Sequence, residues 1–178
     1  MHILARPFAD TVPVILTERL RLRALRLADF DAFAELHASP HAALMWALTS
    51  RDAAWDRFLA LTGEWALRGA GTWALADRRS DAFVGHVGFL QPHDADEPEL
   101  GWALVAGAVG RGLAREGARA ALDWGRQHGM AAPVSHVDAR NVRSLRLAER
   151  LGAVETGRTT FAPEAVAVHF RHQPEMAA

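Results

Sequence analysis

Residues Trp102–Arg115 read Trp-Ala-Leu-Val-Ala-Gly-Ala-Val-Gly-Arg-Gly-Leu-Ala-Arg, and this stretch decides the fold. It predicts an apolar strand, a glycine-rich turn and the beginning of a helix. In that order, the N–H groups of the turn and the positive end of the helix dipole point into one concavity, which suits a phosphate or pyrophosphate. Gly110 and Gly112 would let phosphate oxygens approach the backbone closely. A Gly-x-Gly turn alone is more simply explained as a tight connection, so its function depends on what accompanies it.

Two common phosphate-binding motifs do not match this turn. The P-loop requires Gly-Lys followed by Ser or Thr, and the chain contains no Lys. The dinucleotide-binding fingerprint requires a third Gly or Ala five positions after the first, and that position counted from Gly110 is Arg115. A phosphate bound here would therefore belong to a different kind of site.

Composition excludes several other classes of protein. The 178 residues suffice for one domain with a hydrophobic core, and the net charge of -1 gives no basic field for nucleic acid or an anionic membrane. The chain has no Cys, which excludes disulfides, thiolate metal sites and a Cys nucleophile. It has no Tyr, so no phenol can act as an acid. We expect a cytoplasmic protein, because there is no signal-like apolar run and the longest apolar stretch, 101–110, is too short to cross a membrane.

Hydrophobic periodicity predicts a mixed α/β domain over residues 1–178, with a central sheet flanked by helices. Leu20 and Leu22 alternate with Arg19, Arg21 and Arg23, which indicates a half-buried strand with a solvated basic face rather than a nucleic-acid patch. Ser50 and Asp29 are expected N-caps of helices. We predict the remaining helices and strands over 29–39, 51–68, 113–128 and 141–151, and over 73–76, 82–90, 99–106, 134–138, 153–161 and 166–170.

A second strand–turn–helix unit follows at Val137–Ala153, with Asn141, the only Asn in the chain, as a favoured N-cap. Together the two units resemble the GNAT superfamily of N-acetyltransferases, and within it the RimJ and RimL branch that acetylates ribosomal-protein N-termini. The resemblance covers about residues 17–170. Four stretches carry it: Thr17–Arg23; Gly85–Gly88; Glu99–Trp102 continuing into Gly110–Ala118; and Asn141–Ser144 with Glu149–Gly152.

The resemblance implies a GNAT-type acyl-CoA N-acyltransferase fold, a twisted mixed sheet whose fourth and fifth strands splay apart around the thioester arm of acetyl-CoA. We also predict no metal, because none of the nine His residues forms an i, i+4 pair with a nearby carboxylate of the metalloprotease type. By position, Leu104 and Val105 would offer backbone groups to the pantetheine, and Asn141 and Ser144 would contact the pantetheine or the sulfur region. The pyrophosphate cradle would consist of Gly110, Arg111, Gly112, Leu113, Ala114 and Arg115.

Three positions depart from the family pattern. Val109 stands where the family has Gln or Arg, so a side-chain contribution to the cradle is lost. Ala148 stands where many members have Tyr, and Ala153 replaces the usual Phe. Protonation of the leaving thiolate would therefore rely on Ser144 or water.

The resemblance implies direct attack of a neutral amine on the thioester, with an oxyanion stabilised by a backbone N–H, which we expect from Val105. Glu99 is the candidate base, acting directly or through water; the alternative is an exposed carboxylate at a strand end. His86 is better explained as a hydrogen-bonded strand histidine than as a base. The acceptor would be a peptide N-terminus or a small-molecule amine. Whether the protein forms a homodimer is left open by the sequence.

Two other functions are weighed against acetyl transfer. One is an acyl-CoA-binding module of the same fold without turnover, which the missing Tyr and Val109 favour. The other is a hydrolase using Ser135 or Ser144 with His136 and Asp138; it is disfavoured because no Gly-x-Ser-x-Gly motif is present. Four Trp residues would line an acceptor pocket or, as helical spacing favours, belong to the core: Trp46, Trp55, Trp65 and Trp73.

Overall fold

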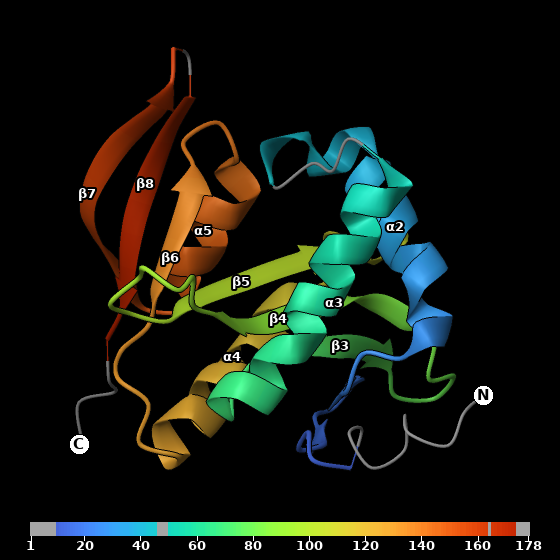
Figure 1. Ribbon diagram of the computed structural model, residues 1–178. Coiled ribbons are helices and arrows are strands. Elements are labelled where there is room, and N and C mark those ends of the chain that lie inside the picture. Colours follow the sequence, from blue (N-terminus) through green and yellow to red (C-terminus); the bar gives the residue numbers. More distant parts are fainter. Residues whose placement is uncertain (1–9, 46–49, 164, 174–178) are drawn as a thin grey trace.

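An eight-stranded sheet in the order β1-β2-β3-β4-β5-β6-β8-β7 forms the centre of the protein (Figure 1). The computed structural model describes residues 10–45, 50–163 and 165–173. The strands are β1 (Ile15–Leu16), β2 (Leu20–Arg23), β3 (Thr72–Asp77), β4 (Phe83–Leu90), β5 (Glu99–Leu104), β6 (Val134–Asp138), β7 (Ala153–Ala162) and β8 (Ala165–His172). The helices are α2 (Phe30–Ala38), α3 (Arg51–Arg68), α4 (Leu113–Gln127) and α5 (Val142–Arg150), with 3-10 turns η1 (Leu27–Asp29), η2 (Pro40–Leu44) and η3 (Ala106–Ala108).

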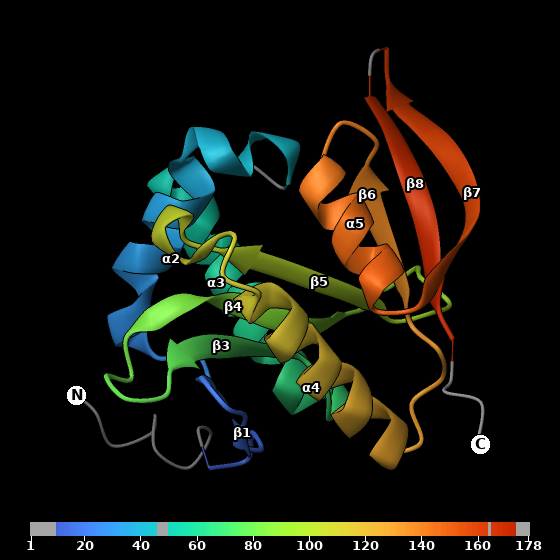
Figure 2. The same cartoon turned by 180° about the vertical axis from the view of Figure 1, so that it is seen from behind.

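Helices cover both faces of the sheet, as the sequence predicts. The helices α2 and α3 lie on one face, and α4 and α5 lie on the other (Figures 1 and 2). Each interface has its own apolar cluster, represented by Phe33 and Phe58 under α2 and α3, Leu75 and Ala121 under α4, and Val168 under α5. Within the described residues, no helix combines the length and apolar character needed to cross a membrane.

Local signals placed most elements correctly. Leu20 and Leu22 are fully buried on β2, and the Ser50 hydroxyl accepts a hydrogen bond from the N–H of Ala53 at 3.1 Å, as an N-cap should. Gly69 ends α3 with φ +70°. The prediction that tryptophans belong to the core is confirmed for Trp65 and Trp73, which meet edge to face with ring centroids 4.6 Å apart.

Trp55 also belongs to an apolar cluster, against Phe30 and Phe58. Trp46 lies outside the described residues. Trp55, Trp65 and Trp73 therefore pack in apolar clusters and do not line an acceptor pocket.

The strands β5 and β6 are the only parallel neighbours in the described sheet, and they pair at one register position, Glu99 opposite Val134. Beyond that position the two strands diverge (Figure 1). The connection between them runs through η3 and α4. The sheet therefore opens at the level of Trp102 and Leu104, which leaves one side of β5 without a strand partner there.

The predicted strand over 99–106 ends earlier, at Leu104. The carbonyl of Val105 accepts the N–H of Ala108 at 2.9 Å, which closes the η3 turn and stops the strand. The glycines that precede α4 follow directly after this turn.

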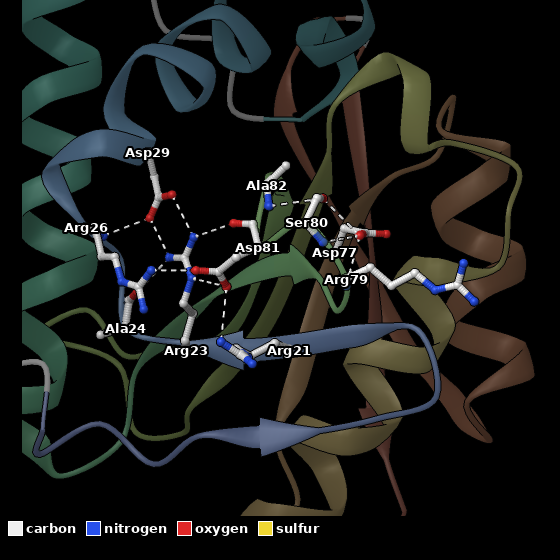
Figure 3. Close-up of polar contacts among 10 residues, drawn as sticks. All are labelled: Arg21, Arg23, Ala24, Arg26, Asp29, Asp77, Arg79, Ser80, Asp81 and Ala82. Atoms are coloured by element: carbon white, nitrogen blue, oxygen red, sulfur yellow. Dashed lines mark hydrogen bonds and ion pairs between the residues drawn. The ribbon is translucent and has the colours of Figure 1, made fainter.

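Arg23 is buried, with 3% of its surface exposed, so the prediction that the basic side of β2 is entirely solvated is wrong at this position. Its Nη1 and Nη2 donate to the two carboxylate oxygens of Asp29 at 2.7 and 2.9 Å, and its Nε donates to Asp81 at 3.2 Å (Figure 3). Asp29 also accepts the N–H of Arg26 at 2.8 Å. Asp29 is the N-cap residue of α2, as predicted, but its side chain makes no capping hydrogen bond to that helix, because Arg23 and the N–H of Arg26 take up its carboxylate.

Breaking this buried pair should destabilise the protein strongly. Arg23→Met leaves the Asp29 carboxylate buried without a counter-ion, and the free energy of unfolding should fall by ~3–5 kcal/mol in urea denaturation. Arg158→Met, which removes an exposed ion pair with Glu155, is the control and should change nothing measurable. An equal response of the two variants would show that the Arg23–Asp29 pair has no special role.

Candidate active site

Two cavities meet where β5 and β6 diverge. The outer cleft, of about 860 Å³, lies between β5, the start of α4 and α5. The inner pocket, of about 100 Å³, lies between β4, β5, β6 and the helices α2 and α3. Because the two cavities share lining residues, a molecule in one can reach a molecule in the other. The shared residues are Leu44, Met45, Trp102, Ala103, Asn141 and Ser144.

A cradle of backbone N–H groups lies at the outer cleft, as the glycine-rich turn predicts. Gly110 and Gly112 both have φ +79°, and Gly112 is the N-cap residue of α4. Among the described hydrogen bonds, none uses the N–H groups of Leu113, Ala114 or Arg115. These donors and the positive end of the helix dipole are therefore available to an anion.

The predicted cradle residues differ in what they offer. Gly110, Gly112, Ala114 and Arg115 line the outer cleft. Leu113 buries its side chain in the core and can contribute only its backbone. The side chain of Arg111 does not line the cleft, and its carbonyl accepts a hydrogen bond from Arg19 at 2.8 Å.

Glu116 on α4 anchors the cradle to the start of β2. Its carboxylate accepts hydrogen bonds from the hydroxyl of Thr17 at 2.6 Å, from the N–H of Arg19 at 2.8 Å and from the Arg19 Nε at 2.7 Å. Burial alone would raise the pKa of Glu116, but these hydrogen bonds outweigh it and lower the pKa. The Thr17–Arg23 stretch thus supports the cradle through contacts that no local pattern indicates.

The N–H of Val105 is not available to a ligand, and the prediction that it stabilises an oxyanion is wrong. It donates to the carbonyl of Val84 on the neighbouring strand β4 at 3.0 Å, and its own carbonyl accepts the N–H of Ala108. Since Val105 and Val84 form a hydrogen-bonded pair, strand alternation turns the N–H and C=O of Leu104 away from β4 and towards the divergence. Leu104 lines the outer cleft and offers the backbone groups there.

Asn141 and Ser144 lie at the junction of the two cavities. The Asn141 side chain accepts the N–H of Ser144 at 3.2 Å, which confirms the predicted N-cap, and donates to the carbonyl of Leu44 at 3.3 Å. The Ser144 hydroxyl accepts the indole N–H of Trp102 at 3.3 Å. Its own hydrogen remains to donate to a group at this junction.

Glu99 lies in the inner pocket with only 13% of its side chain exposed, so it is not a solvated strand end. Its carboxylate is 3.2 Å from Nδ1 of His136. This hydrogen bond raises the pKa of His136, against the effect of partial burial. Sequence reasoning missed this pair because it depends on the register of β5 beside β6.

Two further histidines line the inner pocket, His37 on α2 and His86 on β4, with their Nε2 atoms 3.0 Å apart. Removal from solvent, followed by the charges of His37 and Arg57, places the pKa of His86 well below its usual value. His86 is therefore a neutral, hydrogen-bonded histidine and a weak base, as predicted.

A Ser-His-Asp arrangement is not formed. Asp138 pairs with Arg140 at 2.6 Å rather than with His136. The Ser135 hydroxyl donates to the carbonyl of Leu100 at 2.6 Å and contacts Nε2 of the buried His172 at 2.9 Å. No described hydrogen bond joins His136 to Ser135 or Ser144. Within the described part of the chain, no cluster of three or more His, Asp or Glu side chains is arranged to hold a metal ion.

The fold of this protein is similar to that of known acetyltransferases. A family model described as an acetyltransferase (GNAT) domain matches residues 19–154. The chain belongs to the GNAT acetyltransferase family. GNAT acetyltransferases use acetyl-CoA as donor, and the outer cleft of this GNAT domain offers the backbone donors that its pyrophosphate requires.

Solved structures extend the comparison along the whole GNAT domain. An acetyltransferase from Agrobacterium tumefaciens is 31% identical, with a TM-score of 0.82 over 91% of this chain and 95% of that one. YncA from Salmonella typhimurium, solved with acetyl-CoA, is 22% identical with a TM-score of 0.68 over 90% and 98%. RimL, a ribosomal L7/L12 alpha-N-protein acetyltransferase, is 16% identical with a TM-score of 0.75 over 90% and 93%, and shares the fold.

Among curated proteins, YkkB of Bacillus subtilis is 35% identical over 89 residues, which cover 47% of this chain. The match spans about half the length of that relative, 51%.

Replacing the Glu99 carboxylate should change the protonation of His136. In Glu99→Gln the neutral amide no longer stabilises the imidazolium, so the pKa of His136 should fall, measured by NMR titration of the imidazole resonances. Glu97→Gln is the matched control, because Glu97 pairs with Arg171. A pKa of His136 that is the same in both variants would contradict the pairing with Glu99.

Proposed function

We propose that this GNAT domain, one domain over residues 1–178, is an N-acetyltransferase. It would move an acetyl group from acetyl-CoA to a primary amine on a peptide N-terminus or a small molecule, by direct attack. The observation that carries this proposal is the junction of the two cavities. A cleft with free helix N–H groups meets a pocket that holds a carboxylate and a histidine.

The outer cleft fits acetyl-CoA by the chemistry of its lining. The cradle at Gly110–Arg115 would bind the pyrophosphate, the free backbone edge at Leu104 would bind the amide-containing pantetheine arm, and Asn141 and Ser144 would flank the thioester. The donor supplies an acetyl group activated as a thioester. The residues of the chain orient that group towards the inner pocket.

Glu99 would accept a proton from the acceptor amine, directly or through the hydrogen-bonded His136. The N–H of Leu104, which points to the divergence, would stabilise the developing oxyanion, and one such preorganised donor is worth roughly 3 kcal/mol. The Ser144 hydroxyl would donate a hydrogen bond to the thiolate leaving group, whose ordinary pKa of ~8.5 demands no strong acid. This arrangement compensates for the absent Tyr.

Substitution of Gly112 should prevent donor binding. In Gly112→Val, the added Cβ lies 3.4 Å from Nη2 of Arg19 and a β-branched residue is strained at φ +79°, so the cradle should distort and acetyl-CoA affinity in isothermal titration calorimetry should fall by at least ~10-fold. Gly129→Val is the matched control, because Gly129 also has positive φ (+74°) and open space around it but does not line the cleft. Normal binding by Gly112→Val would refute the cradle.

Turnover separates the enzyme from a binding module of the same fold. Release of CoA thiol, followed with a panel of peptides and small amines, should occur in the wild type and fall by roughly 10²–10⁴-fold in Glu99→Gln. Acetyl-CoA affinity should stay unchanged in that variant, because Glu99 lines the inner pocket and not the outer cleft. Tight acetyl-CoA binding without transfer to any acceptor would favour the binding module instead.

A further inference from the structure

The outer cleft is strongly cationic. Among the described residues that line it there is no Asp or Glu, and five are arginines: Arg115, Arg140, Arg143, Arg146 and Arg150. The last three lie on α5 at spacings of three and four residues, so they share one side of that helix, here called the α5 arginine face. The opposite side of α5 buries Ala148 against β6 and β8.

Among the residues that the structure describes, no carboxylate pairs with the α5 arginine face, whereas most arginines elsewhere have such a partner. Within the described part of the chain, Arg143, Arg146, Arg150 and Arg115 make no hydrogen bond or ion pair through their side chains. Those that form an ion pair with a carboxylate are Arg19, Arg21, Arg23, Arg26, Arg51, Arg68, Arg126, Arg140, Arg158 and Arg171. A concentration of unneutralised guanidinium groups in a concave site favours an anionic ligand.

The position of α5 places these charges beyond the glycine cradle. The helices α4 and α5 lie on the same side of the sheet (Figure 2), and Arg119 of α4 donates to the carbonyl of Leu151, just after α5, at 3.3 Å. The end of α5 that carries Arg150 therefore lies beside α4. The cradle offers backbone N–H groups to one phosphate group, while the α5 arginine face offers guanidinium groups to another.

We propose that the α5 arginine face binds the 3′-phosphate on the ribose of CoA, a site separate from the pyrophosphate cradle. This inference rests on the proposed function. A phosphate monoester carries about −1.5 to −2 charges at pH 7, and guanidinium groups bind such oxygens through paired, charge-assisted hydrogen bonds. The face therefore selects CoA over 3′-dephospho-CoA, which keeps the pyrophosphate and the pantetheine arm.

The test measures the affinity of CoA and of 3′-dephospho-CoA by isothermal titration calorimetry. The wild type should bind CoA at least ~10-fold more tightly, and Arg143→Gln/Arg146→Gln/Arg150→Gln should lose this preference while binding 3′-dephospho-CoA as the wild type does. Exposed side chains are replaced, so thermal unfolding should not change. The corresponding triple Lys variant keeps the charges and should retain part of the preference, and Arg79→Gln, an exposed arginine in the β3–β4 turn, should retain all of it.

Three outcomes would overturn the inference. Equal affinity of the wild type for both ligands would show that the 3′-phosphate is not recognised. An equal loss of affinity for both ligands in the triple Gln variant would assign the face to the pyrophosphate. If neither ligand binds the wild type, the proposed function itself fails. If both ligands bind without preference, the proposed function stands and only the 3′-phosphate site is refuted.

Discussion

The parallel strands β5 and β6 pair at a single register position, and the site depends on their divergence beyond it. Because no strand covers β5 at the level of Leu104, its backbone groups face a cavity instead of a neighbour. The same divergence makes room for the N-terminus of α5, so that Asn141 and Ser144 stand opposite Trp102. Two cavities of different chemistry then meet at one point, one with arginines and unused helix N–H groups and one with a carboxylate.

The pairing of arginines divides the protein into structural and ligand-facing parts. Arg23 is buried with Asp29 and Asp81 and ties β2 to η1 and to the β3–β4 turn (Figure 3). Arg19 holds Glu116 and the carbonyl of Arg111, which keeps the cradle in position. The arginines of the α5 arginine face, by contrast, pair with no carboxylate in the described part of the chain. In a chain without Lys, the distribution of carboxylates thus separates the two roles.

The inner pocket keeps its titratable groups in distinct states. Glu99 supports a positive charge on His136, whereas His37 and Arg57 oppose one on His86. A histidine pair in which His86 is neutral therefore lies beside a carboxylate–histidine pair in the same cavity. This difference is set by His37 on α2, Arg57 on α3 and Glu99 on β5, which are far apart in the sequence.

The sequence by itself determined what depends on neighbouring residues: the helix starts at Ser50 and Asn141, the glycine cradle before α4, and the burial of alternate residues on β2. Each follows from capping, backbone freedom or periodicity within a few positions. Only the tertiary structure decided the rest. In the folded protein the Asp29 carboxylate pairs with Arg23 instead of capping its helix, the N–H of Val105 donates to Val84, and Glu99 pairs with His136. These partners are fixed by strand register and by helices packed across the sheet, and residues tens of positions apart leave no local signal of such contacts.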